Sequence, residues 1–248
     1  MNRVNDLIVG FNQQDSNKVK SLLLRLIPYL EENKYILVGG IAIRYHLISK
    51  GVPYNIRPFN DLDVIAKEEN TLNPKVTQDF LISHYHPAKN SEPYIALVDP
   101  FTKTKVDIFG YDPVPEETFN IDFEGYTVKI PSSEDQLVKT VLDVQRISEK
   151  AKVDPKQFED ARLLMKVSDL KVAIRIWKRK YFARFRTNLI ETLEKAEKRR
   201  SQHPEWVVKN PFRKPEPYIC KECVDANKFP LTPMDKIYKI LDYDISHR

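Results

Sequence analysis

The sequence predicts an α/β (α+β) fold in which a mixed sheet is flanked by helices and is followed by an α-helical domain. Over residues 1–131, short apolar runs rich in β-branched side chains alternate with helical patterns. Over residues 132–200, apolar side chains recur at helical spacing. Residues 201–248 are rich in proline, which favours an irregular, basic tail. We therefore predict a core over 1–131, a helical domain over 132–200 and a tail over 201–248.

In the core, the first apolar pattern predicts a helix with Ser16 as its N-cap and an interruption at Pro28. A short strand then leads into Gly39-Gly40. The elements that we expect after it are a helix over 41–47, a strand over 61–66, a helix near 76–83, a hairpin over 93–111 that turns at "DPFTKT", and a strand within "FEGYTVKIPS".

Three helical stretches follow, and the last, from Ser168 to Ser201, reads as one long helix. Its inward stripe comprises Leu170, Ile174, Trp177, Tyr181, Phe185 and Leu189. Another face carries Arg175, Arg179, Phe182 and Arg186. Basic and aromatic side chains together suit single-stranded RNA or the end of a tRNA, whereas an ordinary amphipathic helix explains the same letters.

Composition limits the class of protein. With 42% hydrophobic residues, the 248-residue chain can form a core. We see no leader and no apolar run of bilayer length, and so expect a cytoplasmic protein without a membrane partner. Residues 1–130 carry net charge −3 and residues 131–248 carry +8. This asymmetry favours an anionic partner of the second half, and a solvated basic face is the alternative.

The Gly39-Gly40 pair lies where a strand turns into a helix. Glycine lets a backbone approach a ligand closely, and the first turn of a helix offers free N–H groups to a phosphate. The pair is therefore a candidate triphosphate seat, although glycine pairs are also common in plain tight turns.

Asp61 and Asp63 stand two apart in a predicted strand, so their carboxylates project from the same face. Neighbouring carboxylates repel one another unless a cation lies between them, and Mg²⁺ prefers such oxygen ligands. Asp107, between apolar residues of another strand, adds a third acid, and three carboxylates could hold two Mg²⁺ ions. The alternative is that each acid pairs with a nearby base, for instance Asp61 with Arg57.

These segments resemble a known family. "VGGIAIRYH" followed by "RPFNDLDVI" is similar to the DNA polymerase β-type nucleotidyltransferase superfamily, and most of all to its AbiEii-like branch. The branch pattern G-G-x-A-x-x-x-H, then R-x-T-x-D-[IL]-D, is matched by Gly39, Gly40, Ala42, His46, Arg57, Asp61 and Asp63. The resemblance covers about residues 15–167 and is strong at three short places.

The resemblance implies a magnesium-dependent nucleotidyltransferase that moves an NMP from an NTP to an RNA or protein acceptor and releases pyrophosphate. Asp61 and Asp63 would bind metal, and Asp107 would orient or deprotonate the acceptor. Lys139 would reach the triphosphate together with Gly39, Gly40 and Arg57. Asp160 would support the site. The branch further implies a toxin, often balanced by an antitoxin.

Two departures from the family pattern bear on activity. Ile41 replaces a phosphate-contacting Ser or Thr, and Phe59 replaces the Thr before D-x-D. They motivate the alternative of a non-catalytic scaffold or RNA-binding protein; a small-molecule nucleotidyltransferase of the antibiotic-modifying type is another. His46 lies one turn after Ala42, and we expect a packed, hydrogen-bonded histidine that at most supports the site. The extra loop between His46 and Arg57 is a candidate for choosing the acceptor.

Cys220 and Cys223 form one C-x-x-C, too few and too close to staple a secreted fold. Structural zinc needs four ligands, and the nearby histidines in the sequence are the scattered His203 and His247. We therefore predict neither a zinc site nor a redox pair here.

Overall fold

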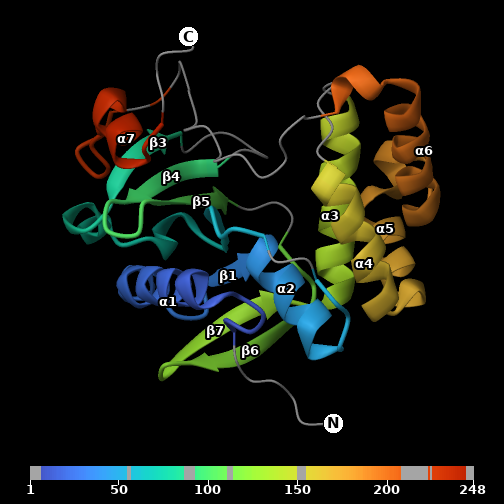
Figure 1. Cartoon of the computed structure of the whole chain (residues 1–248), viewed down its shortest axis with the longest axis horizontal. Coiled ribbons are helices and arrows are strands. Elements are labelled where there is room, and N and C mark those ends of the chain that lie inside the picture. The colour runs from blue at the N-terminus through green and yellow to red at the C-terminus, as the bar shows by residue number, and fades with distance from the viewer. Residues whose placement is uncertain are drawn as a thin grey trace.

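A five-stranded sheet forms the centre of the computed structural model, which describes residues 7–54, 57–86, 93–110, 114–149, 155–207, 223 and 225–243. The strand order is β1-β2-β5-β4-β3, with β2 and β5 parallel and the other neighbours antiparallel. Helices flank the sheet and a helical unit stands beside it (Figure 1). The predicted mixed sheet followed by helices is therefore confirmed.

The elements follow one another along the chain in a simple order. They are α1 (Gln13–Leu26), η1 (Ile27–Tyr29), β1 (Tyr35–Val38), α2 (Gly40–Ser49), β2 (Asp61–Ala66), η2 (Glu69–Thr71), η3 (Pro74–Gln78), β3 (Leu81–Tyr85), β4 (Pro93–Asp99), β5 (Thr104–Gly110), β6 (Thr118–Phe123), β7 (Tyr126–Pro131), α3 (Ser133–Glu149), α4 (Pro155–Val167), α5 (Leu170–Phe185), α6 (Leu189–Gln202), η4 (Pro204–Trp206) and α7 (Met234–Ile240). None of the helices in this described part combines the length and hydrophobicity needed to span a bilayer.

The two faces of the sheet differ in chemistry. One face packs against α1, and its alternate apolar residues belong to a single core cluster, among them Leu37, Leu62, Val64, Leu97, Val106 and Ile108. Because side chains alternate along each strand, the intervening residues Asp61, Asp63, Lys105 and Asp107 point to the opposite face. We call this opposite face the carboxylate face.

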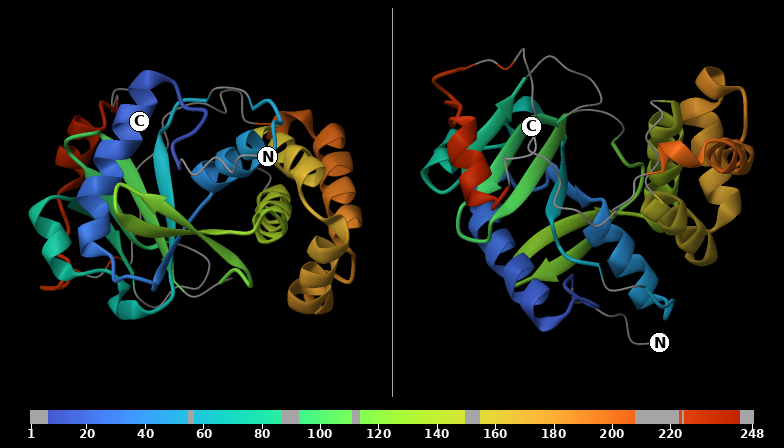
Figure 2. Two further views of the ribbon diagram at one scale, coloured as in Figure 1. Left: turned by 90° about the horizontal axis from the view of Figure 1, so that it is seen from below. Right: turned by 45° about the horizontal axis from the view of Figure 1, so that its top comes forward.

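Helices α3 to α6 form a second core, into which α2 inserts Ile43 and Leu47. Trp177 is fully buried at its centre, and its indole Nε1 donates a hydrogen bond to the Thr187 carbonyl at 2.8 Å. Figure 2 shows from two further directions that this helical unit lies beside the sheet, next to α2. The β6–β7 hairpin leads into it from below β1 in Figure 1.

Before the C-terminal segment, three element predictions are wrong and one strand was missed. Helix α1 begins at Gln13, with Asn12 rather than Ser16 as N-cap, because the Asn12 side chain accepts a hydrogen bond from the Asp15 N–H. The region near 76–83 is not a helix but the short η3 followed by strand β3. Strand β6 was not predicted. The long C-terminal helix is two helices, separated where Arg186 adopts φ 53°.

The C-terminal segment, residues 225–243, wraps the edge strand β3. Phe229 packs against Tyr85 with ring centroids 5.0 Å apart, and the Thr232 N–H donates to the Ile82 carbonyl at 2.8 Å. Helix α7 then buries Ile237 against Val98 on the carboxylate face. The prediction of irregular backbone is therefore wrong for Met234–Ile240. The segment covers polar backbone that an edge strand would otherwise expose.

Candidate functional site

The site starts at the turn between β1 and α2. Gly39 has φ 67° and ψ −141°, a conformation that is accessible almost only to glycine. A Cβ at Gly39 would also collide with the Asp63 carboxylate, with its Cγ only 3.0 Å away. A Cβ at Gly40 would meet open space. Gly39 is thus required by the close approach of Asp63, whereas Gly40 leaves room over the first turn of α2.

Three acids and one lysine share the carboxylate face. In the parallel pair β2–β5, Asp63 lies opposite Asp107, and Asp61 lies opposite Lys105. On the other side of β2, Asp63 lies opposite Val38, the last residue of β1. The predicted convergence of Asp61, Asp63 and Asp107 is therefore built by strand register. Lys105 was not predicted, and its ammonium pairs with Asp107 Oδ2 at 2.7 Å.

The burial and proximity of these charged groups shift their pKa values. Burial, together with the negative charges of Asp61 and Asp107, raises the pKa of Asp63. Burial likewise raises the pKa of Asp107, although Lys105 acts in the opposite direction. Burial alone would lower the pKa of Lys105, but the surrounding carboxylates raise it instead. Among the described side chains of β2 and β5 on this face, three acids accompany one ammonium, that of Lys105, so acids outnumber bases on these two strands.

Asp107 is buried, with 7% of the residue exposed, and its Oδ1 has no hydrogen-bond partner in the described structure. A buried carboxylate oxygen without a partner is costly and points to an additional cation or donor. As the side chains stand, however, no group of three or more His, Cys, Asp and Glu residues in the described ranges is arranged to hold a metal ion. The Lys105 ammonium already binds Asp107, so a metal ion at this carboxylate would have to compete with it for the Asp107 oxygens. The donor set therefore suits Mg²⁺, provided that Lys105 moves.

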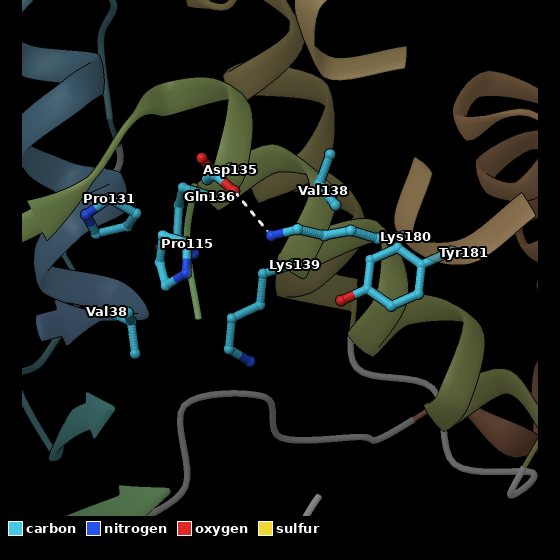
Figure 3. A pocket seen from close by; sticks show the side chains of 9 residues that line it. All are labelled: Val38, Pro115, Pro131, Asp135, Gln136, Val138, Lys139, Lys180 and Tyr181. Carbon is cyan, nitrogen blue, oxygen red and sulfur yellow. Dashed lines mark hydrogen bonds and ion pairs between the residues drawn. The ribbon is translucent and has the colours of Figure 1, made fainter. Parts of the chain in front are cut away.

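A pocket adjoins the carboxylate face beside Val38. Its empty volume of ≈ 270 Å³ includes open solvent, so the pocket is a shallow hollow and not an enclosed cavity. The residues that line it are Val38, Pro115, Pro131, Asp135, Gln136, Val138, Lys139, Lys180 and Tyr181. Figure 3 shows that Lys139 and Lys180 reach it from α3 and α5, and that the Lys180 ammonium points to Asp135. The pocket thus offers two cations close to the Gly39 turn.

Lys139, which we expected to reach a triphosphate, lies on α3 close enough to Asp63 to feel its charge. Its ammonium pairs with Asp143 at 2.7 Å and lies 5.7 Å from the centre of the Phe109 ring. Burial would lower the pKa of Lys139, but Asp143 and then Asp63 raise it above its ordinary value. Lys180, which was not predicted, donates to the Val114 carbonyl at 3.0 Å and lies 3.5 Å from Asp135.

Arg57 does not pair with Asp61. Its buried guanidinium contacts Asp160 at 2.8 Å and Glu159 at 2.7 Å, and it lies over the Tyr54 ring at 4.9 Å. The Tyr54 hydroxyl also donates to Asp160 at 3.2 Å. This cluster ties the segment that leads into β2 to helix α4. The loop between His46 and Arg57, which we considered as a candidate for choosing the acceptor, is held in place at Tyr54 by these contacts. Its residues 55–56 lie outside the described part.

The other predicted positions have structural partners. His46 is buried, and its Nε2 lies 2.8 Å from the Pro131 carbonyl, which joins α2 to the end of β7. The packed, hydrogen-bonded histidine is therefore confirmed, and burial lowers its pKa. Ile41 and Phe59, which depart from the family pattern, are both buried in the main core. Phe59 packs edge-on against Phe11 at 5.8 Å. Their apolar character is explained by packing.

Two lysines were missed, and the sequence holds a signal for one of them. Lys105 stands two residues before Asp107 in a strand, so the two side chains had to share a face. Lys180 sits on α5 among several basic residues, and nothing in the sequence distinguishes it from them. Only the packing of α5 beside α3 turns it toward the pocket.

Comparisons with known proteins give little beyond this geometry. No protein-family model and no curated protein matches the chain. Among solved structures, the chain is similar to the crystal structure of an antigenic nucleotidyltransferase-like protein from Paracoccidioides brasiliensis. The two are 14% identical, with a TM-score of 0.35, over 77% of this chain and 94% of that one. A likeness of this size identifies no function.

Proposed function

We propose that this protein is a magnesium-dependent nucleotidyltransferase that transfers an NMP from an NTP to an acceptor hydroxyl. The observation that carries the proposal is the convergence of Asp61, Asp63 and Asp107 on one sheet face, beside a glycine turn at the start of a helix. Excess buried negative charge, an unpartnered Asp107 oxygen and open space above Gly40 together suit a metal-bound triphosphate.

In this transfer, the acceptor oxygen attacks the α-phosphorus of the NTP. The bond from that phosphorus to its bridging oxygen breaks, and pyrophosphate leaves. Asp107 takes the proton of the acceptor hydroxyl at Oδ1, because this oxygen has no competing hydrogen bond and burial raises the pKa of the carboxyl. Two Mg²⁺ ions held by Asp61, Asp63 and Asp107 would supply charge neutralisation of the triphosphate and activation of the attacking oxygen.

The chain provides two further groups for the triphosphate. Helix α2 has Gly39 as its N-cap, so no cap side chain binds the N–H groups of its first turn, and these groups can bind a phosphate. Lys139, whose pKa is raised in part by Asp63, is the cation that would bind the triphosphate. Arg57 supports the site indirectly, because its guanidinium is already bound by Asp160 and Glu159.

We favour RNA as the acceptor. Arg175 on α5 and Arg186 at its C-terminal cap are exposed, and Phe182 on the same helix is 44% exposed. Arg179 is bound to Glu116 and is less available. The same helix directs Lys180 into the pocket, so one element connects the exposed basic surface with the candidate site. Cationic side chains interleaved with an aromatic ring suit a single-stranded nucleic acid.

The test uses NTPs labelled at either the α- or the γ-phosphate, with Mg²⁺ and total RNA. We expect α-label in nuclease-sensitive material and γ-label in pyrophosphate, and we expect both to be lost in Asp63→Asn. Asp122→Asn, which changes an exposed acid on β6, is the matched control and should retain activity. Protease-sensitive label would replace RNA with a protein acceptor. Absence of pyrophosphate release with every NTP and acceptor pool would favour a non-catalytic scaffold.

A further inference from the structure

Lys105 is a cation built into the carboxylate face. It stands on β5, two residues before Asp107, and strand register places it opposite Asp61 on β2. The side chains of Lys105 and Asp107 are each only 10% exposed, and the ammonium lies 2.7 Å from Asp107 Oδ2. Removing either charge from water is costly, and their pairing offsets that cost. Each group of the pair therefore depends on the other.

The neighbours of Lys105 differ on its two sides. Toward β4, Lys105 lies opposite Val98, which packs against Ile237 of α7 in an apolar cluster. Toward β2, it lies opposite Asp61, and Asp63 is the next acid on the same face of that strand. An ammonium that leaves Asp107 would therefore meet apolar side chains on one side and the acids on the other.

A metal ion at Asp107 would compete with this ammonium. Lys105 binds Oδ2 of the carboxylate, and Oδ1 has no partner in the described structure. Two cations on one buried carboxylate repel each other strongly. If the metal displaced the ammonium, a buried lysine would lose its partner, which is costly. We therefore expect a metal ion without nucleotide to bind weakly to this face.

A triphosphate would remove this cost, because it brings a new anion for the displaced ammonium. The first turn of α2, which can bind a phosphate, begins at the Gly39 turn, and this turn is in close contact with Asp63. Lysine is a compact point charge on a flexible stem, so its ammonium can move from a carboxylate to a nearby phosphate.

We propose that Lys105 is a specificity-determining residue, which releases Asp107 to the metal and binds the triphosphate that arrives with it. The carboxylate face would then accept metal and nucleotide together in preference to either alone. This inference rests on the proposed function and adds a residue to it. Lys139 differs, because its partner Asp143 is not among the proposed metal ligands, so metal binding would not release it.

The first test measures the affinity of the full-length protein for Mn²⁺ without nucleotide, by electron paramagnetic resonance of the free ion. Lys105→Met removes the competing charge and should bind Mn²⁺ about tenfold more tightly than wild type. Lys105→Arg keeps the charge and should bind as weakly as wild type. Lys103→Met is the matched control and should also behave like wild type. Lys103 likewise pairs with an aspartate at 2.7 Å, Asp242, but both side chains are more than half exposed.

A second measurement uses wild-type protein, so it does not depend on whether Lys105→Met folds. Inorganic tripolyphosphate is the probe for the triphosphate. In calorimetric titrations, its preformed complex with Mn²⁺ should bind at least about tenfold more tightly than Mn²⁺ alone or tripolyphosphate alone. In folded Lys105→Met, the advantage of the complex over Mn²⁺ alone should shrink.

Two results would overturn the role of Lys105 and leave the metal site in place. One is equal Mn²⁺ affinity of wild type, Lys105→Met and Lys105→Arg. The other is wild type that binds free Mn²⁺ as tightly as the tripolyphosphate complex. If neither wild type nor folded Lys105→Met binds Mn²⁺ or the complex, the proposed function itself fails, and the inference fails with it.

Discussion

At the scale of single residues, Gly39 shows how the space for a single Cβ atom constrains the site. Its backbone adopts φ 67°, and the space that a side chain would need is taken by the Asp63 carboxylate. Gly40, its neighbour, has neither restriction, since a Cβ there meets nothing within 4 Å. The two glycines look equivalent in the sequence but have different physical reasons to be glycine.

We predict that Gly39→Ala destabilises the protein, whereas Gly40→Ala does not. Gly39→Ala should destabilise the protein by about 1–3 kcal/mol because of backbone strain, with additional displacement of Asp63. Gly40→Ala should be neutral or stabilise by roughly 0.5–1 kcal/mol, because alanine is favoured in a helix. Urea unfolding of both variants measures this difference. Equal destabilisation by the two substitutions would contradict the structure of the turn.

Asp160 provides a prediction about pH. Burial raises its pKa from 3.8 to about 6, even though Arg57 and the Tyr54 hydroxyl stabilise the charged form. The folded state therefore binds more protons than the unfolded state between these values. The contribution of this group to stability is fully present below about pH 3.8 and is lost as the pH rises through about 6. Asp160→Asn should lack this loss.

Urea unfolding of wild type and Asp160→Asn from pH 4 to pH 7 compares the two slopes. The variant should be less stable overall, because Arg57 loses its partner at 2.8 Å, but the difference between the proteins should shrink as the pH rises. A constant difference across this range would show that Asp160 is ionised throughout.

At the scale of elements, the division between α5 and α6 depends on Arg186. This residue caps the C-terminus of α5 in the left-handed backbone conformation, with φ 53° and ψ 24°, in which residues other than glycine are strained. The next helix starts with a capping box, in which Asn188 and Glu191 satisfy each other's backbone N–H groups.

We predict that Arg186→Gly stabilises the protein by about 0.5–1 kcal/mol, since glycine relieves the strain but also increases the entropy of the unfolded chain. Lys178→Gly, at an exposed position in the middle of α5, should destabilise by about 1 kcal/mol. Thermal unfolding of the two variants separates these outcomes. A continuous helix through this region would instead make Arg186→Gly as damaging as Lys178→Gly.

The elements show where prediction from sequence stops. Strand β2 and the shared face of Asp61 and Asp63 follow from the two-residue period of a strand, and both are confirmed. The break at Arg186 had a readable signal in Asn188-x-x-Glu191, which was masked by continuous apolar periodicity. The sequence of strand β3 carried no such signal. The core and the C-terminal segment bury both of its faces, and a strand that is buried on both faces does not alternate polar and apolar residues.

At the scale of the molecule, the carboxylate face lies between two separately built walls. On one side are α3 and α5, which supply Lys139 and Lys180. On the other is α7 with the C-terminal segment, which packs on β3 and β4. No local pattern predicts either wall, since both depend on contacts between residues far apart in the chain. The acids themselves could be predicted; the cations and the cover around them could not.

The C-terminal segment should accordingly be part of the folded unit. Phe229 is 1% exposed and packs against Tyr85, so Phe229→Ala should destabilise the protein by about 3–5 kcal/mol. Phe101 is 72% exposed, and Phe101→Ala should change stability by less than about 0.5 kcal/mol. Chemical denaturation measures both. A small effect of Phe229→Ala would mean that the segment is dispensable for folding.

Calorimetric titration of each NTP into the protein, with and without Mg²⁺, tests most directly whether the carboxylate face binds a metal-bound triphosphate. Wild type should bind at least one NTP only when Mg²⁺ is present. An Asp61→Ala/Asp63→Ala double variant, with its fold checked by circular dichroism, should not bind it. Folded wild type that binds no NTP with Mg²⁺, or a double variant that binds as well as wild type, would contradict a metal-bound triphosphate on the carboxylate face.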